Sequence, residues 1–570
     1  MVKIQVNSQG KAYIANGNAL VASGITPTGT ISISENGSYD VTDYAIADVN
    51  VGTKPEPPEE WQPNPDWWDI ETILKNDTRN YAGKIIILYT NADDFVTINI
   101  GSAYPDAVAT SDGAFYTSTA NHTWDRSQDK PVSSDEDDTT PQYATRYLIL
   151  YFNNADVLYT RLNQYQGTCL YIVFGCNLTK TYTTGIATGT LFYQAKWLQS
   201  FKFLEGYNLD FGTSFANFCY NCFSLKKLPD NLDTSAGTVF TNFCSSCYSL
   251  QKLPDDLDTS AGTVFGNFCA YCYSLLYLPD NLDTSAGTNF SSFCAYCYLL
   301  LYLPDNLDTS AGTVFTSFCR NCYSLQKLPD NLDVSSGNNF STFCAYCYSL
   351  QKLPDNLDTS DGTNFTSFCN SCFSLEKLPD NLDTSAGTNF SSFCSNSYSL
   401  QKLPDNLDTS AGTNFTNFCL GCYSLQKLPD DLDVSSGTNF SSFCSGCVSL
   451  QKLPDNLDTS DGTNFTGFLG QCQYLTQTSD VLDLSNGTVF TNAFQQSSSL
   501  IKANIKLGRY SINISPSGSL DIQSLEYIAN NAPTVTGTVT LTIGATNIER
   551  AGGASGTIIQ TLVNKGWTVN

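Results

Sequence analysis

Histidine, basic residues and long apolar runs are scarce in this sequence, and each shortage argues against one class of function or structure. The 570 residues include one histidine, His122, and no cysteine or aspartate is spaced around it as in a catalytic triad. Lysine and arginine total 28 against 54 acidic residues, a net charge of −26, so the phosphate backbone of a nucleic acid would be repelled. No apolar run reaches about 18 residues, so we expect no transmembrane helix.

What the chain does contain is one unit that recurs every 25 residues, from about Phe215 to Leu500. A fixed period between about 20 and 50 residues is typical of solenoids and arrays. Each copy would bury about seven apolar side chains, but ordering its backbone costs roughly 1–2 kcal/mol per residue, so only stacked copies can be stable. The first phenylalanine of the unit stands at Phe215, Phe240, Phe265, Phe290, Phe315, Phe340, Phe365, Phe390, Phe415, Phe440, Phe465 and Phe490.

The copy that begins at Gly362 illustrates the fold expected of each unit. Within residues 365–372, phenylalanine and cysteine stand at i, i+3, i+4 and i+7, which predicts one face of a helix of about ten residues. Leucines at 375, 378 and 382 follow in a run that predicts a strand, and Pro379 suits the end of that strand. Turn residues occupy 380–387. Twelve coils should therefore stack, with a parallel strand ladder between Leu225 and Leu453 that advances about 4.8 Å per coil.

The run Cys369-x-x-Cys372-x-x-Leu375, followed by Leu378-Pro and Leu382-Asp-Thr-Ser, resembles the BspA-like leucine-rich repeats and related repeats of bacterial surface proteins. Cysteine usually stands here where that family has phenylalanine, although the last copy restores Phe494. We therefore predict an α+β repeat solenoid of the leucine-rich-repeat type, built of 25-residue units. All-β modules should precede it and a small α/β cap should follow it.

The flanking segments define the expected domains. Residues 1–52 are predicted to form a small β module for attachment, with a hairpin at Asn36-Gly37, and residues 53–66 a proline-rich linker. Residues 67–188 should form a β domain that caps the solenoid of residues 189–505, with strands at 84–89, 95–100, 147–152 and 169–174. In the cap, residues 506–570, we expect helices near 522–528 and 558–563 and a strand at 539–543.

Cysteine offers the most tempting chemistry, because 18 of the 22 cysteines form nine Cys-x-x-Cys pairs that suit redox or zinc sites. Comparison of the repeat copies argues against both a redox site and a zinc site. The first position of the pair becomes Leu469 and Phe494, and the second becomes Ser397 and Ser497, changes that no ligand or nucleophile would tolerate. Disulfides between coils fit the expected spacing, but synthesis in a reducing cytoplasm favours free thiols. We predict buried core thiols, no metal and no catalytic residue.

Acidic residues suggest calcium at two places. Asp135-Glu-Asp-Asp138 is interpreted as a solvated acidic loop in preference to a calcium site. Asp230 and Asp233 repeat along one edge of the units, and here too calcium between coils is an alternative. We favour a local role, in which the second aspartate accepts hydrogen bonds from the Thr-Ser turn that follows it.

One irregularity predicts a binding site. The two residues after the first strand leucine are usually Gln-Lys or Lys-Lys, but the third and fourth units have Leu276-Tyr277 and Leu301-Tyr302. If this edge faces solvent, the four side chains form an apolar patch, and such patches often mark binding surfaces. The alternative is a lateral contact with the N-terminal domain or with another subunit.

Both ends of the chain indicate a source for the protein. The passage from Ile25 to Val51 resembles a module of tail and fibre proteins of phages and prophages of gram-positive bacteria. Residues 541–548 and 564–569 resemble the closing segment of leucine-rich-repeat proteins from the same source. The first residues lack the apolar core of a signal peptide. A self-exported adhesin should carry one, whereas a virion protein assembled in the host cytoplasm needs none.

We therefore expect a non-enzymatic, virion-associated protein without a cofactor: a phage tail fibre or host-receptor-binding protein. Its partners would be other virion proteins or a ligand on the host cell surface, with no nucleic acid and no membrane insertion, and self-association is left open. A bacterial cell-surface leucine-rich-repeat adhesin is the alternative. A Cys-x-x-Cys thiol oxidoreductase or metal-binding protein is a more remote alternative.

Overall fold

The computed structural model describes residues 3–6, 12–15, 62, 67–90, 95–96, 105–111, 113, 115–117, 124–125, 145–153, 156–159, 169–180, 192, 194–207, 209–210, 212–515 and 520–570. The chain divides into two compact units, Met1–Pro63 and Asn64–Asn570. In the first unit, β1 (Lys3–Val6) and β2 (Ala12–Ala15) form an antiparallel pair. The hairpin expected at Asn36-Gly37 lies outside the described residues, as do His122 and residues 135–138.

A six-stranded sheet opens the second unit, in the order β12-β10-β3-β8-β5-β6. The pair β10 and β12 is parallel, and the other pairs of this sheet are antiparallel. Three further strands form a parallel sheet in the order β13-β11-β9. Helix α1 (Ile70–Asn76) precedes these strands and buries Ile70 and Leu74. The strands are β3 (Gly83–Thr90), β4 (Phe95–Val96), β5 (Ala107–Thr110), β6 (Phe115–Tyr116), β7 (Trp124–Asp125), β8 (Thr145–Phe152), β9 (Asp156–Tyr159), β10 (Cys169–Gly175), β11 (Asn177–Lys180), β12 (Ser200–Phe203) and β13 (Leu209–Asp210).

The strands predicted at 84–89, 147–152 and 169–174 are confirmed as β3, β8 and β10, and the run that begins at Phe95 contributes the short strand β4. Their β-branched and aromatic residues are the cause, because such side chains pack well on a pleated surface. The buried side chains of this sheet and those of the solenoid belong to one continuous hydrophobic core, which extends from Ile85 to Trp567. The sheet and the coils therefore fold against each other without a boundary in the core.

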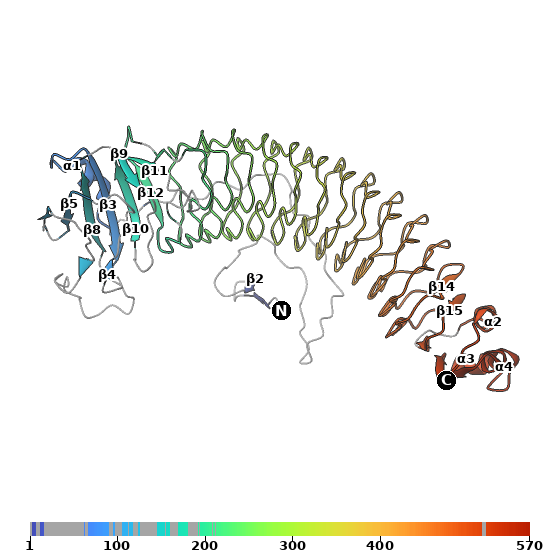
Figure 1. The fold of residues 1–570 in the computed structure, drawn as a ribbon. Coiled ribbons are helices and arrows are strands. Elements are labelled where there is room, and N and C mark those ends of the chain that lie inside the picture. Colours follow the sequence, from blue (N-terminus) through green and yellow to red (C-terminus); the bar gives the residue numbers. More distant parts are fainter. Residues whose placement is uncertain are drawn as a thin grey trace. The chain divides into compact units, whose positions relative to one another are not determined.

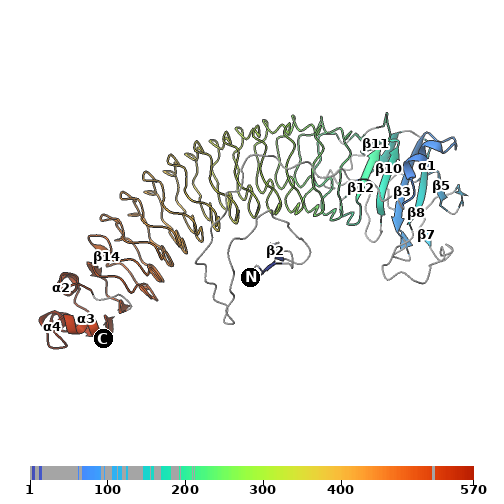
Figure 2. The ribbon, with the colours of Figure 1, turned by 180° about the vertical axis from the view of Figure 1, so that it is seen from behind.

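Twelve coils follow the sheet and stack side by side (Figures 1 and 2). Each coil is joined to the next by a parallel β-bridge at the residue before its first phenylalanine, so the predicted repeat solenoid and its period are confirmed. A second column of bridges connects the lysine positions of most coils from Tyr302 to Lys502. In this column each coil contributes a single bridged residue, whereas the leucine spacing predicted a longer strand. Pro379 and its equivalents shorten the strand, because proline has no N–H to donate.

The helix predicted in each unit is wrong. In the coil of Phe365, the backbones of Ser367 and Ser371 have positive φ angles of 55° and 59°, and every coil has a left-handed residue at both positions. The N–H groups of Phe365, Ser367, Cys369 and Ser371 donate to carbonyl oxygens of the next coil, at 2.7–3.0 Å. Groups that bond outward in this way cannot make the i→i−4 bonds of an α-helix.

The predicted burial within this segment is nevertheless correct. Phe365, Phe368, Cys369 and Cys372 have no solvent exposure, and equivalent phenylalanines of neighbouring coils stack. The ring centroids of Phe365 and Phe390 are 5.6 Å apart, while Phe365 and Phe368 meet edge to face within one coil at 5.7 Å. Two columns of rings in these orientations, together with the buried leucines, form the interior of the solenoid.

The second cysteine of each pair is a hydrogen-bond donor as well as a core residue. Cys372 Sγ donates to Cys344 O of the preceding coil at 3.1 Å, and Ser397 Oγ donates to Cys369 O at 2.8 Å. The first cysteine position, in contrast, also accepts the apolar side chain of Leu469. The exchange of cysteine for serine is therefore confined to the position that must donate, a distinction that the sequence analysis did not make.

Glycine is required at the start of each coil because there is no room for a side chain. A Cβ on Gly362 would lie 2.7 Å from Phe365 Cζ, 2.8 Å from Phe340 Cδ2 and 2.8 Å from Thr359 O. Equivalent glycines in most other coils meet the same three neighbours. The stacked rings thus come within contact distance of the backbone turn.

The C-terminal elements confirm the predicted α/β cap. Strands β16, β17 and β18 form a parallel sheet, and β14 pairs with β15 in parallel. The expected helices are α2 and α4, and the expected strand is β17. None of the described helices has the length and hydropathy that a membrane-spanning helix needs. The elements are β14 (Leu482–Leu484), β15 (Ile505–Leu507), β16 (Ile512–Asn513), α2 (Ile522–Asn531), β17 (Val539–Thr542), α3 (Ala545–Arg550), α4 (Thr557–Asn564) and β18 (Trp567–Val569).

Replacing Gly362 with alanine should destabilise the solenoid, because the new methyl group overlaps two stacked rings and a carbonyl oxygen. We expect the free energy of unfolding to fall by roughly 1–3 kcal/mol, as for other overpacked cores. Urea denaturation of the full chain measures the change. Asp361→Ala is the matched control, since Asp361 is exposed and most coils already have alanine there. Equal stability of the two variants would contradict the packing account.

At Cys372, serine should preserve stability better than alanine by about 1 kcal/mol, because only serine keeps the hydrogen bond to Cys344 O. At Cys369, where other coils accept leucine or phenylalanine, serine should have no such advantage. Thermal or urea unfolding of the four single variants tests this contrast. The same serine preference at both positions would show that the second cysteine has no special role as a donor.

Candidate functional site

The four residues singled out from the sequence lie together on adjacent coils, but they are less exposed than expected. Leu301 N donates to Leu276 O at 3.1 Å, so the two coils are in register at this point. Tyr277 is only 4% exposed, whereas Leu276, Leu301 and Tyr302 are half-buried. The expectation that this edge faces solvent is therefore wrong for Tyr277. The part that a partner could reach consists of the two leucines and the edge of Tyr302.

Tyr302 gives this patch an unusual polar group. Its hydroxyl oxygen is buried and has no hydrogen-bond partner within the described parts of the chain. Burial, followed by the negative charge of Asp280, raises the pKa of Tyr302 to about 12, so the hydroxyl is protonated at neutral pH. A buried hydroxyl without a partner costs free energy, so Tyr302 is a locally unfavourable feature of this patch.

The thiols whose burial is described are enclosed in the core, including one cluster of three. Cys344, Cys369 and Cys372 have their Sγ atoms within 4.8 Å of one another, with Cys344 Sγ 3.4 Å from Cys369 Sγ. All three are fully buried, and burial raises the pKa of the Cys344 and Cys369 thiols well above the usual value. At Cys372, burial also acts to raise the pKa, but hydrogen bonds with these two thiols lower it to about 5, and its Sγ is as fully enclosed as theirs. The protonated thiol is neither a good nucleophile nor a metal ligand. Their packing and their hydrogen bonds to backbone carbonyls account for these residues.

The aspartates of the turns act locally, as predicted. Asp233 Oδ1 accepts hydrogen bonds from Ser235 N at 3.1 Å and from Ser235 Oγ at 2.7 Å. The same pair of bonds, from Ser310 to Asp308, lowers the pKa of Asp308. Asp230 forms an ion pair with Lys227 at 2.9 Å. One oxygen of each turn carboxylate thus accepts hydrogen bonds within its own coil.

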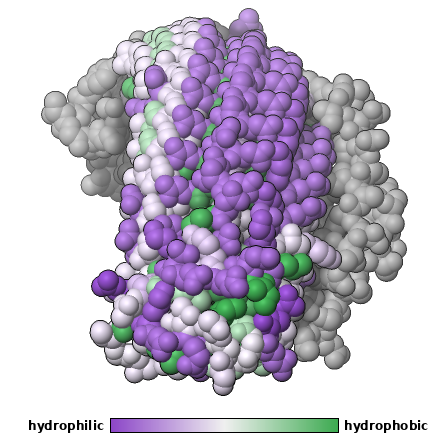
Figure 3. Space-filling view, turned by 90° about the vertical axis from the view of Figure 1, so that its right-hand side faces the viewer, coloured by the Kyte–Doolittle hydropathy of each residue, from purple (hydrophilic) through white to green (hydrophobic). Residues whose placement is uncertain are grey.

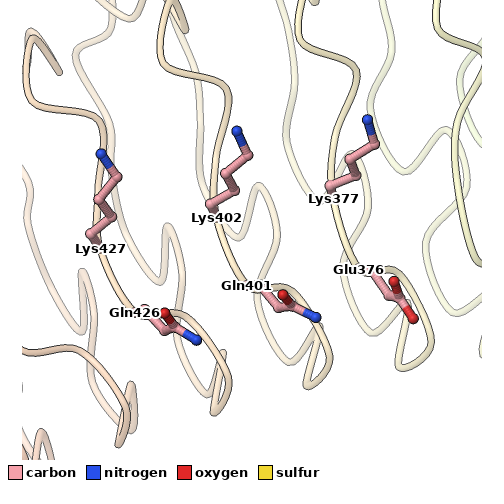
Figure 4. A pocket seen from close by; sticks show the side chains of 6 residues that line it. All are labelled: Glu376, Lys377, Gln401, Lys402, Gln426 and Lys427. Atoms are coloured by element: carbon pink, nitrogen blue, oxygen red, sulfur yellow. The ribbon is translucent and has the colours of Figure 1, made fainter.

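Glutamine and lysine form two exposed rows along one side of the coils. The lysine side chains of three successive coils lie parallel beside the row of Gln and Glu side chains (Figure 4). Together they line a shallow groove of about 300 Å³. Exposed carboxylates of the preceding coil lie near the amines, as in Lys327 Nζ to Asp305 Oδ1 at 3.6 Å, and add little stability. The residues of the groove are Glu376, Lys377, Gln401, Lys402, Gln426 and Lys427.

A ladder of stacked aromatic rings lies on the surface of the coils, one ring per coil. Neighbouring ring centroids are 4.4–4.8 Å apart and the rings are within 14° of parallel. Lys196 Nζ lies 5.7 Å from the centroid of Phe223, the first ring. The ladder consists of Phe223, Tyr248, Tyr273, Tyr298, Tyr323, Tyr348, Phe373, Tyr398 and Tyr423. The sequence signal was available, because an aromatic residue directly follows the second cysteine position in nine successive units.

A second, shorter column contains an instructive gap. Tyr271 and Tyr296 stack at 4.4 Å, and Tyr346 occupies the same position two coils after Tyr296. Between them the position is held by Asn321, and the Arg320 guanidinium fills the vacant place, 5.6 Å from the Tyr296 ring and 5.8 Å from the Tyr346 ring. All three tyrosines have positive φ, a costly conformation for bulky residues, so the stacking must offset strain.

Comparison with known proteins finds similarity over part of the chain and gives no function. A family described as "Mycoplasma protein of unknown function, DUF285" matches residues 312–431 and 388–507, about a third of the chain. Among solved structures, a leucine-rich repeat protein from Eubacterium ventriosum shows 14% identity and a TM-score of 0.26. The match covers 58% of this chain and 85% of that one. No curated protein matches.

Proposed function

We propose that the chain is a non-enzymatic binding protein that serves in a virion as a tail fibre or host-adhesion protein. The observation that carries this proposal is the regular outer surface of the coils. Side chains of one kind repeat from coil to coil in aligned rows, and a broad hydrophilic face covers the stack (Figure 3). Rows fixed to a ladder of backbone hydrogen bonds are pre-organised, so little conformational entropy is lost when a partner binds.

The chemistry of the described residues supports binding in preference to catalysis. Cysteine is the most frequent reactive side chain there, and each thiol whose burial is described is enclosed in the core. Thiol catalysis needs a thiolate that substrate can reach. The turn aspartates are occupied by serine hydroxyl and backbone N–H groups of their own coil. The buried thiols and the turn aspartates therefore stabilise the fold.

A bacterial cell-surface adhesin is the second candidate. It is favoured by the match of residues 312–507 to a family of bacterial origin, since the repeat surface would serve a cell as well as a particle. Neighbouring genes separate the two candidates, because tail and lysis genes would support a virion protein and secretion or sortase genes an adhesin. Antibody labelling tests the choice directly: gold particles on purified virions support the first proposal, and label restricted to bacterial cells overturns it.

Within this function, we place a contact with a host ligand or companion virion protein at Leu276, Tyr277, Leu301 and Tyr302. The support is the break in the Gln-Lys rows and the half-exposed leucines. Tyr277 is too deeply buried to be touched, so Leu276, Leu301 and the edge of Tyr302 would make the contact. Binding at this patch would cover its apolar surface.

Replacing Leu276 and Leu301 with glutamine, the residue common at these positions in other coils, should leave the fold intact and weaken attachment to cells or particles. We expect a loss of about tenfold in affinity, because two half-buried leucines contribute roughly 1 kcal/mol or slightly more at an interface. Pull-down and cell-binding assays measure it. Gln401→Ala, in the same row but outside the patch, is the control. Undiminished attachment of the double variant in both assays would exclude the patch.

A further inference from the structure

The aromatic ladder stops at a place where its last ring remains uncovered. Tyr423 is followed in the next coil by Val448 and in the coil after that by Gln473. Tyr423 is 43% exposed, and Tyr474, beside Gln473, is 65% exposed. Tyr474 N donates to Val448 O at 3.3 Å, which fixes its coil directly after that of Val448. Stacking of the coils thus continues past Val448, and only the ring is missing.

The missing ring leaves a slot whose size is set by the coils. Hydrogen-bonded coils advance by about 4.8 Å, so Tyr423 and Gln473 are separated by about twice that distance. One flat group about 3.5 Å thick fits between them, at the distance from Tyr423 that every other ring of the ladder keeps from its neighbour.

The column of Tyr296 and Tyr346 shows what this surface accepts in such a place. There the ring is also missing, and a guanidinium group occupies the position between two tyrosine rings. Arg320 Nε is buried and forms no hydrogen bond within the described part of the chain, so stacking on the rings is its main interaction. Among the described residues, no cation is found over Tyr423 comparable to Arg320. Both gaps interrupt a column of rings, but the gap at Asn321 has a tyrosine on each side and a guanidinium over them, whereas the gap at Val448 has a ring on one side only.

We propose that the slot over Val448, between Tyr423 and Gln473, binds an arginine side chain of a partner protein. The guanidinium would lie over the exposed Tyr423 face, as Arg320 lies over Tyr296 at 5.6 Å, and its charge would be attracted to the quadrupole of the ring. A chain of net charge −26 draws a basic partner toward itself at long range. This inference rests on the proposed binding function and assigns the chemistry of one partner.

The test compares short oligolysine peptides that differ at one central residue, which is lysine, arginine or citrulline. Long-range attraction is equal for the lysine and arginine peptides, so a difference between them reports the slot. We expect the arginine peptide to bind the full chain roughly two- to fivefold more tightly than the lysine peptide by calorimetry. The citrulline peptide, which is flat but uncharged, should bind most weakly.

Val448→Tyr is the decisive variant, because it continues the ladder as in the nine preceding coils and fills the slot without disturbing the fold. It should abolish the preference for arginine and leave lysine-peptide binding unchanged. Val448→Ala keeps the slot open and should retain the preference, and Tyr423→Ala should lose it. Thermal unfolding checks that each variant is folded.

Equal binding of the arginine and lysine peptides to the natural chain would overturn the inference. So would a preference for arginine that survives in Val448→Tyr, or Val448-dependent binding of a neutral oligosaccharide in place of arginine. Concentration-dependent self-association that Val448→Tyr abolishes would assign the slot to a second copy of the chain and overturn it as well. Attachment of the natural chain to cells or particles is measured separately. If attachment is observed together with any of these results, only the arginine inference fails and the proposed function stands. If no attachment is observed, the proposed function itself is contradicted.

Discussion

The hydrogen bonds between coils are the constraint on which the rest of this structure depends. Every coil places a left-handed residue at two positions four residues apart, such as Ser367 and Ser371, and these turn alternate N–H groups toward the next coil. The intervening N–H groups bond within the coil, as from Phe368 N to Phe365 O at 3.1 Å. Backbone groups that would be orphaned in a short helix are thus satisfied by a neighbour. The consequence is that no coil can be stable without its neighbours.

Because the backbone repeats with this regularity, side chains of one kind must stack on themselves. Phenylalanine rings form two buried columns, tyrosine rings form a surface ladder, and the second cysteine or serine donates to the coil before it. A substitution in one coil therefore changes the packing of two others. This coupling explains why Gly362 and its equivalents recur without exception, since a side chain there would overlap rings of its own coil and of the preceding one.

The sequence predicted the solenoid and its core well, because the period and the apolar spacing depend directly on stacking. It did not predict the backbone conformation of residues 365–372, since the spacing i, i+3, i+4 and i+7 buries the same side chains in a helix and in this coil. Serine or asparagine at positions such as 367 and 371 was the available signal, because both residues disfavour helix interiors and asparagine tolerates positive φ. The exposure of Tyr277 could not be predicted, because it depends on packing outside its own unit.

Function in such an array can be located by irregularity. In a surface where each residue stacks on its own kind, an aligned row is explained by the fold, whereas a break in the row needs a separate cause. The break at Asn321 has one within the chain, since Arg320 fills the vacant position between two rings. The break at Leu276 and Leu301 leaves apolar surface around a tyrosine hydroxyl that lacks a partner among the described residues. The break at Val448 leaves the Tyr423 face open. Like the break at Leu276 and Leu301, it is an irregularity for which the described residues supply no cause.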